Sequence, residues 1–375
     1  MPGKKVYCRN MDSYCKILKD KCGIFGIYGS ESASELTYLG LFALQHRGQE
    51  SAGIISGDAD ELNIYKGMGL VEKVFNKRVL SSLKGNYAIG HVRYSTTGSS
   101  LQKNAQPLLV STNKGEIGIA HNGNLVNAGE LRKELEKEGS IFQTTVDSEI
   151  ILHLIARDPS NLFSVSLKNA LNRIKGAYAL TIIKKGMIIG ARDPHGFRPL
   201  CIGKKDYAHI LSSETCALDL IGAQFVRDVE PGEIVYITDS GIKSEKMSDS
   251  VHRKSFCIFE YIYFARPDST IEGRNVHIMR KNMGKELAKE HPVCADLVIP
   301  VPDSGNSAAL GYAEESGIPF EMAIIRNHYI GRTFIQPSQD FRDFSVRVKL
   351  NPIKSIIKGK RIVVIDDSIV RGTTS

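Results

Sequence analysis

The 375-residue chain is long enough for two domains, and its hydrophobic fraction of 42% is ordinary for a protein with substantial cores. Residues 1–21 hold six Lys or Arg against two Asp, so this leader contributes +4 of the net charge of +8. The remaining charge forms no long basic run and no stretch reaches signal-peptide or transmembrane length, which argues against nucleic-acid binding and against membrane insertion, and we expect a cytoplasmic protein.

From Cys22 to about Asp239, short β-rich runs alternate with glycine turns, which predicts antiparallel sheets. Between these runs lie segments whose apolar residues recur at spacings of three and four, which predicts helices that cover the sheets. The expected strands lie within 22–29, 87–98, 116–124 and 177–193, and the expected helices are 34–48, 128–139 and 147–158.

The pattern changes near residue 255. A helical segment at 275–291 is followed by apolar runs within 295–305 and 360–372, and this alternation is typical of a parallel α/β sheet. We therefore expect a second domain over 255–375. The segment 331–352 is charged and interrupted, which predicts a loop that closes over a substrate.

Cys22 opens the run CGIFGI, and by itself it is more typical of a buried strand thiol than of a catalyst. Removal of residues 1–21 would give this residue a thiol and a free α-amine, whose pKa of about 8 lets it accept the thiol proton. An Asn-Gly pair such as Asn122-Gly123 is usually a turn, and an Arg that follows a helix, as Arg47 does, is usually a cap.

The motifs CGIFGI, LQHRGQES, HVRYSTTG, HNGNLVN and TTVDSEI occur in this order. Together they resemble the class II, N-terminal-nucleophile glutamine amidotransferases. The resemblance implies an αββα sandwich of four layers over 22–254, a propeptide at 1–21, and Cys22 as the nucleophile that attacks the glutamine side-chain amide. The other implied roles are an oxyanion hole at Asn122 and Gly123, the glutamine α-carboxylate at Arg93, the α-ammonium at Asp147, and pocket shaping by Arg47 and Gly48.

A Cys-His dyad is conceivable, in which His46, His91 or His121 would be the base for Cys22, but the same family uses the α-amine as its base. We therefore expect these histidines to be structural or to support the residues that contact the substrate, and their spacing supports no metal site.

The string VVIDDSIVRGTTS, residues 363–375, carries the strongest local signal in the chain. A β-branched run brings Asp366 and Asp367 to the carboxyl end of a strand, where open α/β sheets bind ligands. The hydroxyl- and glycine-rich loop that follows can hold a phosphate, while adjacent carboxylates suit ribose hydroxyls and Mg²⁺. It is not a Walker A loop, which needs Gly-Lys before Ser or Thr.

The same string resembles the phosphoribosylpyrophosphate (PRPP) signature of type I phosphoribosyltransferases. The resemblance implies a pyrophosphate loop at 301–305 and a Mg²⁺ site at Ser304, Asp366 and Asp367. The implied PRPP-binding residues are Asp366, Asp367, Arg371, Gly372, Thr373, Thr374, Ser375 and Arg332.

The two signatures together resemble the glutamine PRPP amidotransferases, which catalyse the first committed step of purine synthesis. The resemblance implies glutamine and PRPP as substrates, and 5-phosphoribosylamine, pyrophosphate and glutamate as products. It also implies inhibition by purine nucleotides and a homotetramer.

Cys257, in SFCIFEYIYFARPDS, is by itself typical of a buried strand thiol. The string resembles the subset of this family that carries a propeptide and a [4Fe-4S] cluster, in which this position is one ligand. Such a cluster needs about four thiolates, and the family's other ligands lie beyond residue 375. We therefore expect a fragment of a longer protein, with a phosphoribosyltransferase domain that is incomplete at its C-terminus.

Two other interpretations stay open. A class II amidotransferase that serves a different acceptor, such as a sugar phosphate or an aspartate, would keep the motifs up to Asp147 but would not explain VVIDDSIVRGTTS. A regulatory or inactive subunit would keep residues 1–21 and would lack glutaminase activity.

Overall fold

The structure is a computed structural model that describes residues 22–58, 61–94, 101–248, 253–327 and 349–368. The chain divides into two compact units, Met1–Cys257 and Ile258–Ser375. Among the described residues, no helix combines the length and the apolar character needed to cross a membrane.

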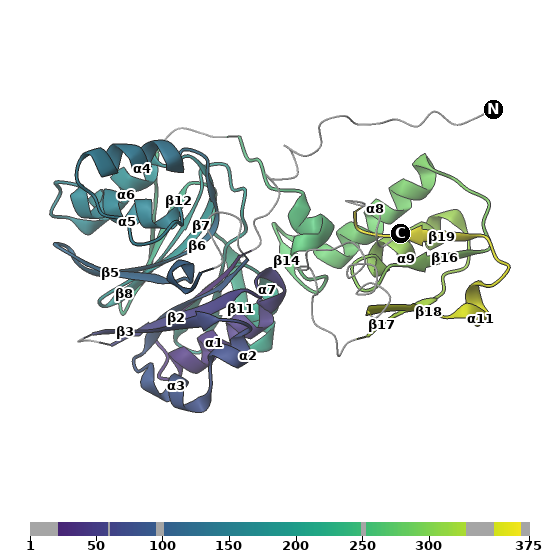
Figure 1. Ribbon diagram of the computed structural model, residues 1–375, viewed down its shortest axis with the longest axis horizontal. Helices are drawn as coiled ribbons and strands as arrows, with labels where there is room; N and C mark the ends of the chain where they lie inside the picture. Colours follow the sequence, from purple (N-terminus) through teal and green to yellow (C-terminus); the bar gives the residue numbers. More distant parts are fainter. Residues whose placement is uncertain (1–21, 59–60, 95–100, 249–252, 328–348, 369–375) are drawn as a thin grey trace. The chain divides into compact units, whose positions relative to one another are not determined.

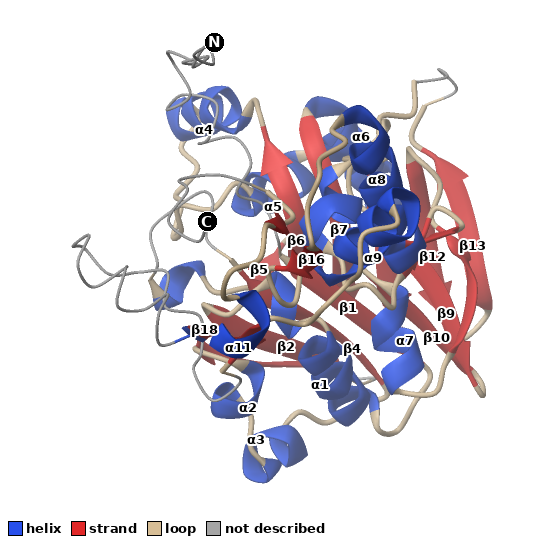
Figure 2. Cartoon of the chain, turned by 90° about the vertical axis from the view of Figure 1, so that its right-hand side faces the viewer, coloured by secondary structure: helices blue, strands red, loops and turns tan. Residues whose placement is uncertain are grey.

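Two antiparallel sheets form the centre of the first unit (Figure 1). In the first sheet, described here as sheet A, the strands lie in the order β11-β9-β10-β1-β4-β2-β3. In Figure 2, β1, β4 and β2 run side by side across this sheet. The strands of sheet A are β1 Gly23–Tyr28, β2 Ser51–Gly57, β3 Leu62–Met68, β4 Tyr87–Arg93, β9 Cys201–Lys205, β10 Ala208–Ser212 and β11 Gln224–Asp228.

The second sheet, sheet B, has the order β13-β12-β8-β7-β6-β5. Its strands are β5 Leu108–Thr112, β6 Gly115–Leu125, β7 Gly176–Lys184, β8 Met187–Arg192, β12 Glu233–Thr238 and β13 Gly241–Lys246. The strand and helix segments expected from the sequence before residue 240 are confirmed by these elements and by the helices that pack on them, except that residues 95–98 of the expected segment 87–98 lie outside the described residues.

Helices cover the outer face of each sheet. Those on sheet A are α1 Ala33–Ala43, α2 Val71–Val74, α3 Lys77–Ser82 and α7 Thr215–Leu220, and those on sheet B are α4 Ala128–Lys137, α5 Ser148–Arg157 and α6 Phe163–Arg173. Two short 3₁₀ turns, η1 Gln45–Arg47 and η2 Gln102–Asn104, lie in the connections. Figure 1 shows the helix, sheet, sheet and helix layers of this unit.

Three separate apolar clusters fill the spaces between these four layers. One lies between sheet A and its helices, one between sheet B and its helices, and one between the two sheets. Strand β1 shows why: Phe25 and Ile27 belong to the helix-facing cluster, while Ile24 belongs to the inter-sheet cluster. Successive side chains of a strand point to opposite faces, so a strand that is buried on both faces is apolar throughout. The arrangement is the αββα sandwich expected from the sequence.

The second unit contains a parallel strand pair, β16 Leu297–Pro300 and β19 Ile362–Ile365, in which Val298 lies opposite Val363. Its other elements are η3 Glu260–Phe264, β14 Thr270–Ile271, β15 Arg274–Asn275, α8 Val276–Glu290, α9 Asn306–Ser316, β17 Ile324–Arg326, β18 Leu350–Pro352 and α11 Lys354–Ile357. The parallel pairing expected from the sequence is confirmed.

One expectation for this unit needs correction. Residues 350–352 of the predicted loop 331–352 form β18, because they pair in antiparallel register with β17. Residues 328–348 of that loop lie outside the described residues.

Helices α8 and α9 pack closely because glycines stand where they meet. A Cβ added to Gly284 would lie 1.9 Å from the carbonyl oxygen of Ala308, and one added to Gly311 would lie 1.8 Å from that of Lys281. Each helix therefore presents bare backbone to the other. Lys281 and Lys285 add ion pairs to Glu314 across the same contact.

Gly284→Ala should therefore lower the free energy of unfolding of the second unit by about 1–3 kcal/mol, because the new methyl group has to push the helices apart. Gly129→Ala is the matched control, since Gly129 in α4 has open space around it, and it should change stability by no more than about 1 kcal/mol in the stabilising direction. Denaturant unfolding of both variants measures the difference, and equal effects would contradict this account of the contact.

Candidate functional site

Cys22 lies immediately before β1, at the end of sheet A where Gly23 pairs with Val92. Its side chain is buried, and its Sγ donates a hydrogen bond to the backbone oxygen of Tyr94 at 3.6 Å. Side chains alternate along a strand, so Cys22 projects to the same face as Ile24, which packs between the sheets. The thiol thus lies at the edge of the inter-sheet layer.

A buried ion pair fixes the backbone of Cys22. Arg47 donates from Nε to the Cys22 carbonyl oxygen at 3.0 Å and from Nη1 to Glu214 Oε1 at 2.6 Å. The side chains of Arg47 and Glu214 are both 0% exposed. His46 Nε2 reaches the same Glu214 oxygen at 2.7 Å. Arg47 therefore orients the residue that carries the thiol, and His46 is structural, as expected.

Gly48 and Arg93 meet through the backbone. A Cβ on Gly48 would lie 2.6 Å from the backbone nitrogen of Arg93, so only glycine allows this approach. The Arg93 side chain is almost completely buried, and its Nη1 donates to Glu50 Oε1 at 2.6 Å. A guanidinium has five N–H donors in a planar fork, a geometry that matches carboxylates.

Asn122 and Gly123 lie on β6, the strand of sheet B that carries the HNGN motif. Asn122 is 0% exposed, and neither its Oδ1 nor its Nδ2 has a hydrogen-bond partner among the described residues. A buried amide without partners costs free energy unless a ligand satisfies it. Gly123 has a φ of +154°, and an added Cβ would lie 2.0 Å from the Ala177 carbonyl oxygen. This pair is part of a strand and not the turn that an Asn-Gly pair usually forms.

Asp147 connects helix α5 to the same strand. One of its oxygens accepts a hydrogen bond from the Leu125 N–H at 2.9 Å, and the other lies 3.4 Å from His121 Nδ1. Burial by itself would raise the pKa of Asp147, but the His121 ring and the N–H groups of Leu125 and Ser148 outweigh it and lower that pKa. The carboxylate is therefore ionised at neutral pH, as a partner for an ammonium group must be.

In the second unit, the predicted pyrophosphate loop wraps over the carboxyl end of the parallel strands. Val301 N donates to the Ile365 oxygen at 2.8 Å, and a Cβ on Gly305 would lie 2.4 Å from that same oxygen. Asp366 follows Ile365 directly, so the loop 301–305 and the acidic pair share one edge of the sheet. Arg326 at the end of β17 forms an ion pair with Asp303 of this loop.

Asp366 and Asp367 form a half-buried acidic pair. Burial raises the pKa of Asp366, and the neighbouring charge of Asp367 raises it further, although the Asp367 N–H donates to Asp366 Oδ1 at 2.8 Å. Two adjacent carboxylates are the hard oxygen donors that Mg²⁺ prefers, and the loop that carries Ser304 lies at the same edge of the sheet. These residues therefore fit a magnesium ion.

Some of the expected site residues lie outside the described residues. These are Arg332 in the predicted loop and Arg371, Gly372, Thr373, Thr374 and Ser375 after the acidic pair.

Cys257 is described, and its N–H donates to the Phe197 oxygen at 3.3 Å. Within the described ranges, no group of three or more His, Cys, Asp or Glu side chains is arranged to hold a metal ion. The described residues therefore do not fit a complete [4Fe-4S] cluster, which needs about four thiolates.

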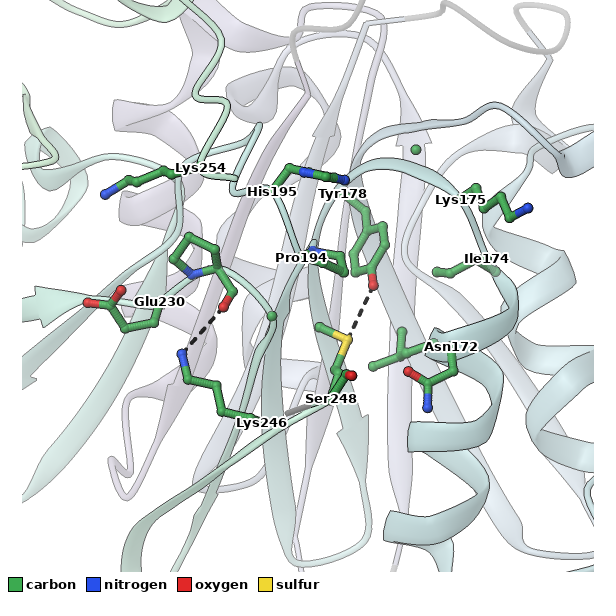
Figure 3. Close-up of a pocket in the computed structure, with 15 residues that line it drawn as sticks. Asn172, Ile174, Lys175, Tyr178, Pro194, His195, Glu230, Lys246, Ser248 and Lys254 are labelled. Atoms are coloured by element: carbon green, nitrogen blue, oxygen red, sulfur yellow. Dashed lines mark hydrogen bonds between the residues drawn. The ribbon is translucent and has the colours of Figure 1, made fainter. Parts of the chain in front are cut away.

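The first unit also has a hollow of about 940 Å³, whose described lining includes Tyr178, the strand partner of Gly123 (Figure 3). The lining also includes Lys175, Lys246 and Lys254, and the Tyr178 hydroxyl donates a hydrogen bond to the Met247 sulfur at 3.3 Å. None of the predicted site residues belongs to its described lining. The candidate chemistry lies instead at the end of the inter-sheet layer and at the edge of the parallel strands.

Several partners in the site were not predicted from the sequence. Glu214 and Glu50 pair with Arg47 and Arg93; Glu214 lies outside the quoted motifs, and Glu50 lies in LQHRGQES without a predicted role. Gln106 binds the backbone of His121, although 15 residues separate the two. Such partners are chosen by the fold, so sequence spacing gives no signal for them.

Comparison with known proteins gives matches for both units. Residues 91–220 match a family described as a glutamine amidotransferase domain. The amidophosphoribosyltransferase of Bacillus subtilis (strain 168) is 54% identical over 361 residues, which are 96% of this chain and 76% of that protein. The amidophosphoribosyltransferase of Methanocaldococcus jannaschii is 51% identical over 375 aligned residues, which cover 94% of this chain and 79% of that protein.

Solved structures agree with these relatives. One, described as the allosteric regulatory enzyme of purine biosynthesis, superposes with a TM-score of 0.89 at 53% identity and covers 94% of this chain and 76% of that chain. Another, glutamine PRPP amidotransferase from B. subtilis complexed with ADP and GMP, gives a TM-score of 0.88 at 53% identity and covers 94% of this chain and 77% of that chain. The expected fold class is confirmed for both units.

Arg47→Met should lower the free energy of unfolding of the first unit by about 3–5 kcal/mol, because Glu214 stays buried and loses its guanidinium partner. Arg173→Met is the control, since Arg173 pairs with Glu134 at the surface with side chains 45% and 43% exposed, and its loss should cost no more than about 1 kcal/mol. Urea unfolding compares the two variants. Similar losses in both would mean that the buried pair does not hold this corner of the sheet.

Proposed function

The chain belongs to the amidophosphoribosyltransferase family, which uses glutamine to aminate PRPP in purine biosynthesis, and we propose that its two units divide this reaction between them. Residues 22–254 release ammonia from glutamine, and residues 255–375 join that ammonia to PRPP. The observation that carries the first half is the buried Asn122 amide, which has no partner among the described residues and lies beside the positive-φ Gly123.

In the glutaminase step, Cys22 is the nucleophile. Residues 1–21 are a propeptide, and their removal exposes the α-amine that takes the proton of the thiol. The Cys22 Sγ then bonds to the glutamine side-chain carbon, and the negative charge that develops on the amide oxygen is accepted by Asn122 Nδ2 and the Gly123 N–H. Ammonia leaves with that proton, and water cleaves the thioester to give glutamate and restore the thiol.

Glutamine is oriented by charges at both ends of its α-carbon. Arg93 binds the α-carboxylate and Asp147 binds the α-ammonium, while Arg47 and Gly48 shape the pocket. The buried guanidinium of Arg93 and the lowered pKa of Asp147 support these roles, because each group keeps its charge where water is scarce.

In the transfer step, ammonia forms a bond to C1 of the ribose while the bond from C1 to pyrophosphate breaks, which gives 5-phosphoribosylamine. Asp366 and Asp367 orient the ribose and, with Ser304, hold Mg²⁺. When it is bound, the ion offsets the charge that builds on the leaving pyrophosphate. The loop 301–305 lies beside the leaving group. Gly372, Thr373, Thr374 and Ser375 hold the 5′-phosphate, Arg371 also binds PRPP, and Arg332 belongs to the loop that closes over the substrate.

The remaining proposals concern regulation and assembly. The B. subtilis structure with ADP and GMP supports purine nucleotides as inhibitors of this chain as well. A homotetramer, a cytoplasmic location and a [4Fe-4S] cluster that uses Cys257 stay predictions from the sequence. No step of the proposed reaction depends on the cluster.

The nucleophile is tested by separating the two sources of ammonia. In the full-length processed protein, Cys22→Ala should lower glutamine-dependent pyrophosphate release from PRPP by about 10³-fold or more, since the attacking atom is lost. Release driven by added ammonium should persist. Cys294→Ala removes an exposed thiol and should change neither rate. Failure of the processed wild-type protein to release pyrophosphate with glutamine would refute the proposed function.

The acceptor half is tested at the acidic pair. Asp366→Asn should lower pyrophosphate release with either glutamine or ammonium by about 10- to 100-fold and should raise the Mg²⁺ concentration needed for half-maximal rate, because a metal-site oxygen loses its charge. Glutaminase activity should remain. Asp268→Asn is the control, because Asp268 lies at the surface beside Arg266. An unchanged Mg²⁺ dependence in Asp366→Asn would exclude this carboxylate from the metal site.

A further inference from the structure

Strand β6 pairs with β5 only up to a point just before the candidate oxyanion hole. Strand β5 pairs with β6 from Gly115 to Ile119 in the described register, and Leu108, the partner of Ile119, is the first residue of β5. The N–H and the carbonyl of His121 therefore face a side on which strand pairing has ended. Buried backbone groups need hydrogen-bond partners, so something else has to satisfy them.

Two side chains take the place of the missing strand. Gln106 Oε1 accepts a hydrogen bond from the His121 N–H at 2.9 Å, and His91 Nε2 lies 3.0 Å from the His121 carbonyl oxygen. All three residues are buried, with exposed fractions of 0–4%. Gln106 comes from the segment before β5, and His91 comes from β4 on the opposite sheet.

The chemistry of His91 fixes the direction of its bond. A carbonyl oxygen only accepts, so Nε2 must carry the hydrogen and donate it. Burial lowers the pKa of His91 to about 3, and the charges of Arg93, His121 and Lys66 favour the same neutral form. The ring therefore stays neutral at physiological pH and acts here as a fixed donor and not as a base.

The segment that carries Gln106 is itself held in place. Lys66 Nζ donates to the carbonyl oxygens of Ala105 at 2.7 Å and Pro107 at 3.3 Å, on either side of Gln106. Asn104 and Thr145 exchange two hydrogen bonds of 2.9 and 3.0 Å. The acceptor that receives the His121 N–H is therefore anchored to β3 and to the loop before Asp147.

We propose that His91 and Gln106 are positioning residues that set the oxyanion hole of Asn122 and Gly123. The inference rests on the proposed function. The His121 carbonyl and the Asn122 N–H belong to the same planar peptide group. The hydrogen bond from His91 therefore fixes the orientation of the peptide group that joins His121 to Asn122. The Asn122 amide has no side-chain partner among the described residues, so the backbone has to hold it. Neither His91 nor Gln106 is required to touch the substrate.

A positioning role predicts a specific kinetic signature. The negative charge on the amide oxygen develops only in the transition state, so an oxyanion hole that is misplaced lowers kcat and leaves substrate binding nearly unchanged. A role in general stability would instead lower every activity of the protein in parallel.

The test compares His91→Leu, His91→Gln and Gln106→Met in the full-length processed protein. Leu and Met remove the hydrogen bonds, whereas Gln at position 91 keeps an N–H donor. For glutamine hydrolysis, His91→Leu and Gln106→Met should lower kcat by roughly 10- to 100-fold, the scale of a small misplacement, with a much smaller change in KM. His91→Gln should recover a large part of the loss.

Two further measurements distinguish a displaced oxyanion hole from a loss of folded protein. Ammonium-dependent pyrophosphate release should stay at the wild-type rate in all three variants. Alkylation of Cys22 by iodoacetamide, followed on the N-terminal peptide by mass spectrometry, should also be unchanged, because that reaction forms no oxyanion.

The inference is overturned by an unchanged kcat in His91→Leu, by equal losses in His91→Gln and His91→Leu, or by a parallel loss of ammonium-dependent activity. An inactive wild-type protein would overturn the proposed function together with this inference. An active wild type beside an unaffected His91→Leu would overturn the positioning role alone.

Discussion

The face-to-face packing of two antiparallel sheets is the constraint on which the first unit depends. Most of the layer between them is apolar and closed, with Ile24, Ile89 and Ile183 among its buried members. Cys22 precedes β1, Arg93 ends β4, and Asn122 lies within β6, three strands whose inner faces form this layer. A polar site at the margin of a dry layer gains electrostatic strength, because fewer water dipoles compete for its charges.

Burial also destabilises charged side chains, and the structure compensates for this by pairing them. Arg47 and Arg93 would be unstable as isolated buried charges, and each is paired with a glutamate at 2.6 Å. The pairs also hold backbone: Arg47 binds the Cys22 carbonyl, and the corner around Arg93 packs against Gly48. The Asn122 amide is different, since both of its polar atoms are buried without a described partner, and its hydrogen-bonding capacity is available to a ligand.

In the second unit, a parallel strand pair brings two distant segments of the chain to one edge of the sheet. Parallel strands place their carboxyl ends at one edge, so the loop 301–305 and Asp366 meet there although about sixty residues separate them in the sequence. The Ile365 carbonyl joins them, because it accepts from Val301 and lies against Gly305. The two units thus carry the separate sites that we propose for the two half-reactions.

The sequence by itself determined the two-part organisation, the main strands and helices, and the motif residues, because alternation and short-range spacing record which faces are buried. The turn expected of Asn122-Gly123 in isolation became a strand once β7 paired with it. Only the tertiary structure decided the partners Glu214, Glu50, Gln106 and His91. Their side chains act on backbone or charge that is distant in the chain, and no local periodicity encodes such a meeting; it exists only after the two sheets have closed on each other.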